Sequence, residues 1–114
     1  MQCEDMALSY RLRQAGVALV FLPEALHRYR LRSSIRGLFK QTRVWGYQEA
    51  LVYRDFREPL VPARSASLAR SEWSSALREL IAARSRADLA RCAVRLGYSA
   101  GRLHGSLRYR VFYP

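Results

Sequence analysis

The chain has 114 residues, one domain or less, and half of them are hydrophobic. It can therefore bury a core, which excludes disorder as a description of the whole chain. The formal net charge is +11, almost all of it from arginine because Lys40 is the only lysine, and this charge favours anionic partners such as nucleic acid, an acidic membrane surface or a phosphorylated substrate. Cys3 and Cys92 lie too far apart in sequence to indicate a zinc site or a disulfide framework, so a reducing, cytosolic compartment is expected.

The N-terminal third predicts one helix followed by extended chain. From Asp5 to Ala15 the pattern is helical, and Gly16 lies where a C-terminal helix cap belongs. The apolar run 17–22, ended by Pro23, predicts a buried strand. Residues 26–31 form a second short strand or an extended loop. The longest apolar run is far too short to span a bilayer, so the chain is expected to be soluble or peripheral to a membrane.

A long helix is predicted next. Ser33 and Ser34 are suitable N-caps, and the helical pattern continues to about Phe56. A basic stripe follows one face of this helix, formed by Arg36, Lys40, Arg43 and Tyr47.

Two further helices are predicted after a loop or hinge between Arg57 and Arg70, where prolines and small residues gather. Ser71 is expected to open the first of them. Ser85 with Asp88 matches a capping box and opens the second, which we expect to fray or kink around Gly97, Gly101 and Gly105.

The predicted fold class is therefore mainly α with one or two short strands. A lone strand cannot form a stable sheet, so the run 17–22 needs partner strands that this sequence does not contain. We accordingly expect a fragment of a larger domain or an obligate assembly.

The order of motifs adds a resemblance. The acidic pair ED, the helix LSYRLRQAG, the apolar strand and the turn PEA together resemble family 2 nucleotide-sugar glycosyltransferases of the GT-A fold. The run SSIRGLFKQTRVWGYQEA is similar to the helix that follows in that family, so the resemblance covers about Cys3 to Phe56. It implies an origin in an α/β, Rossmann-like domain. Three regions follow: 1–32 as the acceptor-side end of the catalytic domain, 33–58 as a basic amphipathic helix, and 59–114 as a helical extension.

The resemblance also implies a reaction, the transfer of a hexosyl-type sugar from a nucleotide-sugar donor to an acceptor hydroxyl with inversion. Asp5 would be the base that takes the proton of the hydroxyl, and Glu4 would support it or contact the acceptor. The expected partners are the nucleotide-sugar and an acceptor that can be lipid-linked or part of the cell envelope. The expected location is the cytoplasm, at the inner face of the membrane.

Substrate binding is assigned by the same resemblance. Arg30 and Arg32 occupy the stretch where the family places basic residues near the donor phosphates, and Arg36 is a further candidate. Tyr29 falls where many relatives carry a histidine, and Ala7 falls where many carry another acidic residue.

The donor side of the reaction is expected elsewhere. A divalent metal, Mg²⁺ or Mn²⁺, is expected for the intact enzyme and would be bound by a D-x-D motif upstream of Cys3. No D-x-D occurs in this chain, so we expect no metal ligand here and negligible transfer by the chain alone.

Alternatives remain open for these residues. Glu4 and Asp5 would also satisfy a helix N-terminus, and the arginines would also form a solvated face. The alternative function is a small basic helical module that binds nucleic acid or an anionic membrane surface. Nucleic acid is disfavoured because no helix-turn-helix or zinc spacing is present. His27 and His104 are expected to be ordinary surface histidines.

Overall fold

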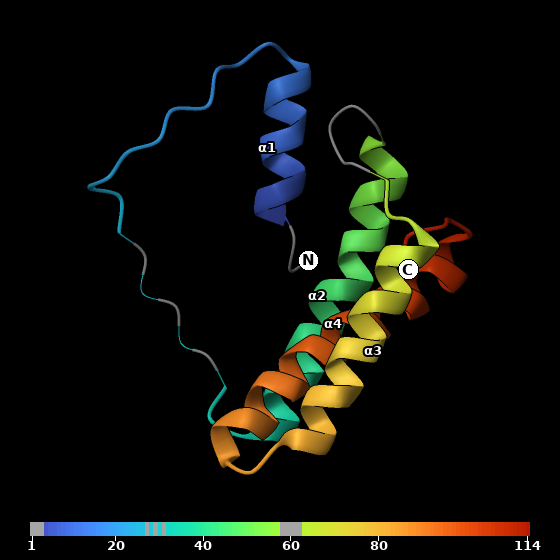
Figure 1. The fold of residues 1–114 in the computed structure, drawn as a ribbon. Helices are drawn as coiled ribbons and strands as arrows, with labels where there is room; N and C mark the ends of the chain where they lie inside the picture. Colours follow the sequence, from blue (N-terminus) through green and yellow to red (C-terminus); the bar gives the residue numbers. More distant parts are fainter. Residues whose placement is uncertain (1–3, 27, 29, 31, 58–62) are drawn as a thin grey trace.

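The computed structural model describes residues 4–26, 28, 30, 32–57 and 63–114. The described part is mainly helical, as predicted, and contains no strand. Figure 1 shows its four helices, which are α1 (Glu4–Gln14), α2 (Ile35–Phe56), α3 (Ala66–Ala82) and α4 (Arg86–Tyr109). Helix α4 packs against α2 on one side and against α3 on the other, while α1 contacts α2.

Helix α1 agrees with its prediction to within a residue at each end. Gly16, with φ at 75°, ends it in the left-handed region that glycine adopts without strain. The helix packs on the C-terminal end of α2, where the rings of Tyr10 and Phe56 lie 5.5 Å apart and the Arg11 guanidinium lies over Phe56.

The predicted strand at 17–22 is absent from the structure. Residues 17–26 form no ladder and loop away from the helices (Figure 1), and Val20, Phe21 and Leu26 are 77%, 86% and 89% exposed. The physical reason is that a strand needs a neighbour for its backbone hydrogen bonds, and no described segment supplies one. The described residues of the second extended piece, 26, 28 and 30, also lie outside regular structure.

The start of α2 is confirmed and the start of α3 is corrected. Ser34 caps α2, its hydroxyl accepting the Gly37 N–H at 3.1 Å, and the helix ends at Phe56 as predicted. Helix α3, in contrast, begins after Ser65, whose hydroxyl accepts the Leu68 N–H at 3.1 Å. Ser71 is therefore inside the helix, because Ser65, a serine with the same capping chemistry six residues earlier, starts it.

The capping box of α4 is confirmed. The Ser85 hydroxyl accepts the Asp88 N–H at 3.1 Å, and an Asp88 carboxylate oxygen accepts the Ser85 N–H at 2.9 Å. Hydrogen bonds from the Ser85 hydroxyl and from the backbone lower the pKa of Asp88, because they favour its charged form.

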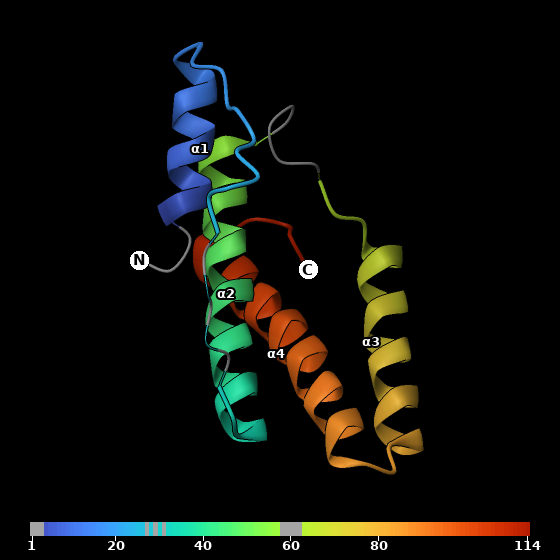
Figure 2. The ribbon, with the colours of Figure 1, turned by 90° about the vertical axis from the view of Figure 1, so that its left-hand side faces the viewer.

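The expected fraying of α4 at its glycines is wrong, because these glycines contact α2. A Cβ added to Gly101 would lie 2.1 Å from the Arg43 carbonyl oxygen, and one on Gly46 would lie 2.2 Å from the Tyr98 carbonyl oxygen. Gly97 lies beside Thr42, and Gly105 lies beside Ala50. The two helices therefore run in the same direction with their backbones in contact, and Figure 2 shows that they cross at an angle.

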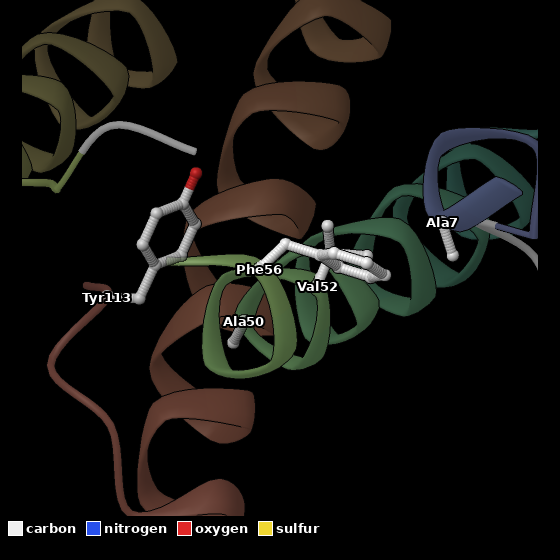
Figure 3. Packing of buried hydrophobic residues seen from close by; sticks show 5 residues of the cluster. All are labelled: Ala7, Ala50, Val52, Phe56 and Tyr113. Atoms are coloured by element: carbon white, nitrogen blue, oxygen red, sulfur yellow. The ribbon is translucent and has the colours of Figure 1, made fainter. Parts of the chain in front are cut away.

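The apolar core lies near the C-terminal end of α2. Figure 3 shows its buried residues, which are Ala7, Ala50, Val52, Phe56 and Tyr113. After α4 the chain turns at Arg110, in the left-handed region at φ 53°, and returns so that Tyr113 stacks on Tyr53 with 4.6 Å between ring centroids.

Arg102 of α4 links three helices. Its Nε donates to Glu49 of α2 at 2.7 Å, and its Nη1 donates to Glu72 of α3 at 3.2 Å. Its side chain is only 15% exposed, so these charged hydrogen bonds are screened less than those of a surface pair.

The glycine contact predicts the sign of one substitution. Gly101→Ala should lower the free energy of unfolding by about 1–3 kcal/mol because the methyl group overlaps a carbonyl oxygen of α2. In an uncrowded helix the same change would stabilise by roughly 1 kcal/mol. Urea unfolding measures the difference, with exposed Leu107→Ala on the same helix as the control, expected within about 0.5 kcal/mol of the parent. Stabilisation by Gly101→Ala would contradict the contact.

The Arg102 linkage predicts a second difference. Arg102→Ala should destabilise by about 1–3 kcal/mol because it leaves Glu49 without this charged donor and detaches Glu72 from α4. Arg91→Ala removes a 71% exposed partner of Asp88 on the same helix and should cost less than about 1 kcal/mol. Equal losses in thermal or urea unfolding would contradict a special role for Arg102.

Candidate functional site

The acidic pair predicted to be catalytic lies at the start of α1. Glu4 and Asp5 are both exposed in the first turn, where carboxylates interact favourably with the helix dipole. Asp5 Oδ1 accepts the backbone N–H of Met6 at 2.9 Å. The pair is thus accessible to an acceptor molecule. Its carboxylates are equally suited to a purely structural role, in which they stabilise the N-terminus of α1.

The arginines predicted to bind phosphate lie at the other end of α2. Arg30, Arg32 and Arg36 are all exposed, Arg36 within the first turn of α2. Figure 2 shows the start of α1 beside the C-terminal half of α2, so the structure does not bring these arginines together with Glu4 and Asp5. Tyr29, the remaining predicted residue, lies outside the described residues.

The structure instead brings basic side chains together between α2 and α4. Lys40, Arg43, Val44 and Tyr47 of α2 and His104 of α4 line a hollow of about 390 Å³, here called the basic groove. Three of the four residues of the predicted basic stripe line it. His104 was expected to be an ordinary surface residue. Its place in the groove was not predictable from the pattern of α2, because His104 lies on another helix about 60 residues later in the sequence.

Contacts across the basic groove join the two helices. Arg43 Nη2 lies 3.4 Å from His104 Nδ1, and because a guanidinium only donates, the imidazole nitrogen is the acceptor. The Tyr47 ring lies 4.9 Å from the His104 ring and 5.0 Å from the Tyr109 ring. The groove therefore has a cationic wall on α2 and a tilted aromatic cluster at one end.

The groove lies on the side of α4 away from α3. Arg102 points toward α3, where it binds Glu72, and His104 follows two residues later. Two residues rotate a helix by about 200°, so the His104 side chain leaves the opposite face. The ion pairs of Arg102 and the basic groove thus occupy separate surfaces.

A second hollow, of about 770 Å³, lies where the ends of α2, α3 and α4 meet, and its charges are paired. Arg95 forms an ion pair with Glu79, and Arg91 forms one with Asp88. The Cys92 side chain at its wall is buried. We assign this hollow to helix packing, because its charged groups already satisfy one another.

The described residues carry no metal-binding cluster and no membrane-spanning helix. The described residues contain no group of three or more His, Cys, Asp or Glu side chains able to hold a metal ion. Among the described helices, none combines the length and the apolar character that crossing a bilayer requires. Comparisons of the chain with protein-family models, with curated proteins and with solved structures found no match.

The aromatic cluster predicts an alkaline loss of stability. Burial, and then a hydrogen bond to Tyr47, raise the pKa of Tyr109 from 10.0 to about 12. The folded chain therefore retains this proton where the unfolded chain releases it, and the associated stability, complete below pH 10, is lost as the pH rises toward 12.

Tyr109→Phe tests this effect because it keeps the ring and removes the ionisable hydroxyl. Urea midpoints measured between pH 9 and pH 12 should fall less steeply for Tyr109→Phe than for the parent, with both proteins compared at pH 7 as the reference. Parallel curves would show that the hydroxyl does not contribute.

Proposed function

We propose that this chain is the acceptor-side part of a family 2 glycosyltransferase, which transfers a sugar from a nucleotide-sugar to an acceptor hydroxyl with inversion. The observation that supports the proposal is the exposed apolar segment 17–26, which directly follows the helix that begins with Glu4 and Asp5. A sheet supplied by a donor-binding region would pair with this segment, and the segment would then connect the acidic helix to the catalytic domain.

The energetics favour such a partner. Val20, Phe21 and Leu26 are each more than three-quarters exposed, and Leu22 is 60% exposed. Burying a side chain of this size contributes about 1.5–3 kcal/mol, so the four together represent roughly 6–12 kcal/mol available to strand pairing. That gain is comparable with the whole net stability of a small domain.

In this proposal Asp5 acts on the acceptor. Its carboxylate takes the hydroxyl proton while the oxygen attacks the anomeric carbon and the nucleoside diphosphate departs. Glu4, next to it in the exposed first turn, contacts the acceptor or supports the base. The described residues do not fit a metal site, so no step is assigned to a metal here.

The phosphate-binding role of Arg30, Arg32 and Arg36 is part of this proposal and depends on a rearrangement of the chain before α2. These arginines precede or begin α2, beyond the segment 17–26, so strand formation in that segment would change where Arg30 and Arg32 lie relative to Asp5. Tyr29 belongs to the same stretch and shares this condition.

The segment itself supplies the first test. In hydrogen exchange, amides 18–22 of the isolated chain should exchange at nearly unprotected rates because they form no ladder, whereas the Val17 amide donates to the Leu12 carbonyl oxygen. When the strand-rich donor-binding half of a family 2 glycosyltransferase is fused ahead of residue 1, the same amides should become protected. An unchanged exchange rate in a folded fusion would contradict the proposed pairing.

The acidic pair supplies the second test. The same fusion, given its nucleotide-sugar and a hydroxyl acceptor, should transfer sugar, and Asp5→Asn should reduce transfer by roughly 10²–10⁴-fold while leaving exchange protection intact. Asp55→Asn, an exposed carboxylate at the end of α2, is the matched control and should retain activity. Transfer at an ordinary enzymatic rate by the isolated chain would contradict the need for a donor-binding half.

A further inference from the structure

The basic groove gathers positive charge at one place on the surface. Lys40 and Arg43 are exposed on α2, and His104 reaches the same hollow from α4. The like charges of Lys40 and Arg43 repel each other, so an anion that enters the groove stabilises the arrangement.

No carboxylate of the described chain answers this charge. The ion pairs of α2, α3 and α4 lie elsewhere, and within these helices none joins Lys40 or Arg43 to an acid. The described pairs are Arg54–Asp55, Arg64–Glu72, Arg91–Asp88, Arg95–Glu79 and Arg102 with Glu49 and Glu72. The acidic side chains of the three helices are thus engaged away from the groove.

We propose that the basic groove binds the phosphate group of a phosphate ester whose organic part is apolar. Arg43 presents a planar fork that matches two phosphate oxygens, and Lys40 adds a point charge beside it. His104 Nδ1 accepts from Arg43, which leaves the Nε2 position to donate to a third oxygen.

Exposed apolar side chains near the groove favour an apolar organic group on the phosphate ester. Val44 lines the hollow and is 42% exposed, and Leu107, about one helical turn after His104 on α4, is 73% exposed. An apolar group attached to the bound phosphate would cover these side chains and gain from their burial. A nucleic acid strand needs a track of several phosphate contacts, whereas this groove is one compact cluster.

The test uses the full chain and two sources of the same chemistry. Calorimetric titration with phenyl phosphate measures binding of a soluble ester, and co-sedimentation with phosphatidylcholine vesicles, with and without phosphatidic acid, measures binding of a lipid ester. Arg43→Gln and Lys40→Gln should each weaken binding by about tenfold or more. Arg43→Lys, which keeps the charge but loses the fork, should fall between Arg43→Gln and the parent.

The control removes one charge elsewhere. Arg78→Gln changes an exposed arginine of α3 that does not line the groove, and it should leave affinity within about twofold of the parent. Circular dichroism melting verifies that each variant is folded. Saturable binding of phenyl phosphate with this pattern supports a soluble ligand, and the same pattern confined to phosphatidic acid vesicles supports a lipid ligand.

Three results would overturn the proposal. One is equal weakening by Arg78→Gln, which would reduce the effect to net charge. The second is the absence of saturable binding to either ester. The third is tighter binding of a single-stranded oligonucleotide than of both esters, with a salt dependence that indicates several phosphate contacts.

Discussion

The contact between the backbones of α2 and α4 is the constraint on which the rest of the structure depends. Small residues on both helices, Gly46 on one and Gly101 on the other, allow a separation that no side chain would fit. The larger side chains of the two helices must therefore point to either side of this contact. On one flank Arg102 meets Glu49 and Glu72, and on the other His104 meets the basic stripe of α2. The ion-pair network and the basic groove both follow from one close approach.

Local chemistry could be predicted from the sequence, and long-range contact could not. The caps at Ser34 and Ser85 depend on residues within four positions, and both are where the pattern placed them. The start of α3 was misplaced because Ser65 and Ser71 offer the same capping group, and sequence pattern alone does not rank them. The low helix propensity of glycine predicts a weak point at Gly101, whereas in the structure Gly101 is held by its contact with another helix. The place of His104 in the basic groove was likewise not predictable, because its neighbours in the groove lie on α2.

The segment 17–22 shows a different limit of prediction. Its apolar character indicates burial, but strand structure requires hydrogen bonds to a neighbour, and apolar composition does not supply them. In the described chain the segment is exposed. The apolar pattern thus indicates that these side chains favour burial, but it does not determine the conformation that the segment adopts. Helix α2 behaves differently, because a helix forms its backbone hydrogen bonds within itself. Its bounds were therefore predicted nearly to the residue.

The placement of the basic groove on the tightest helix contact also determines how rigid it is. The carbonyl oxygen of Arg43 and the amide nitrogen of Tyr47 lie against Gly101, so the backbone that carries two of the groove's side chains is fixed by packing. Pre-organised groups lose less conformational entropy when they bind than groups on a mobile loop do. By the same reasoning Arg30 and Arg32, which lie in irregular chain, are poorer binding groups until a partner orders them. The two groups of basic residues thus differ in what fixes them: Lys40 and Arg43 are held in place by the packing of α2 on α4, whereas the geometry of Arg30 and Arg32 depends on the pairing of residues 17–22.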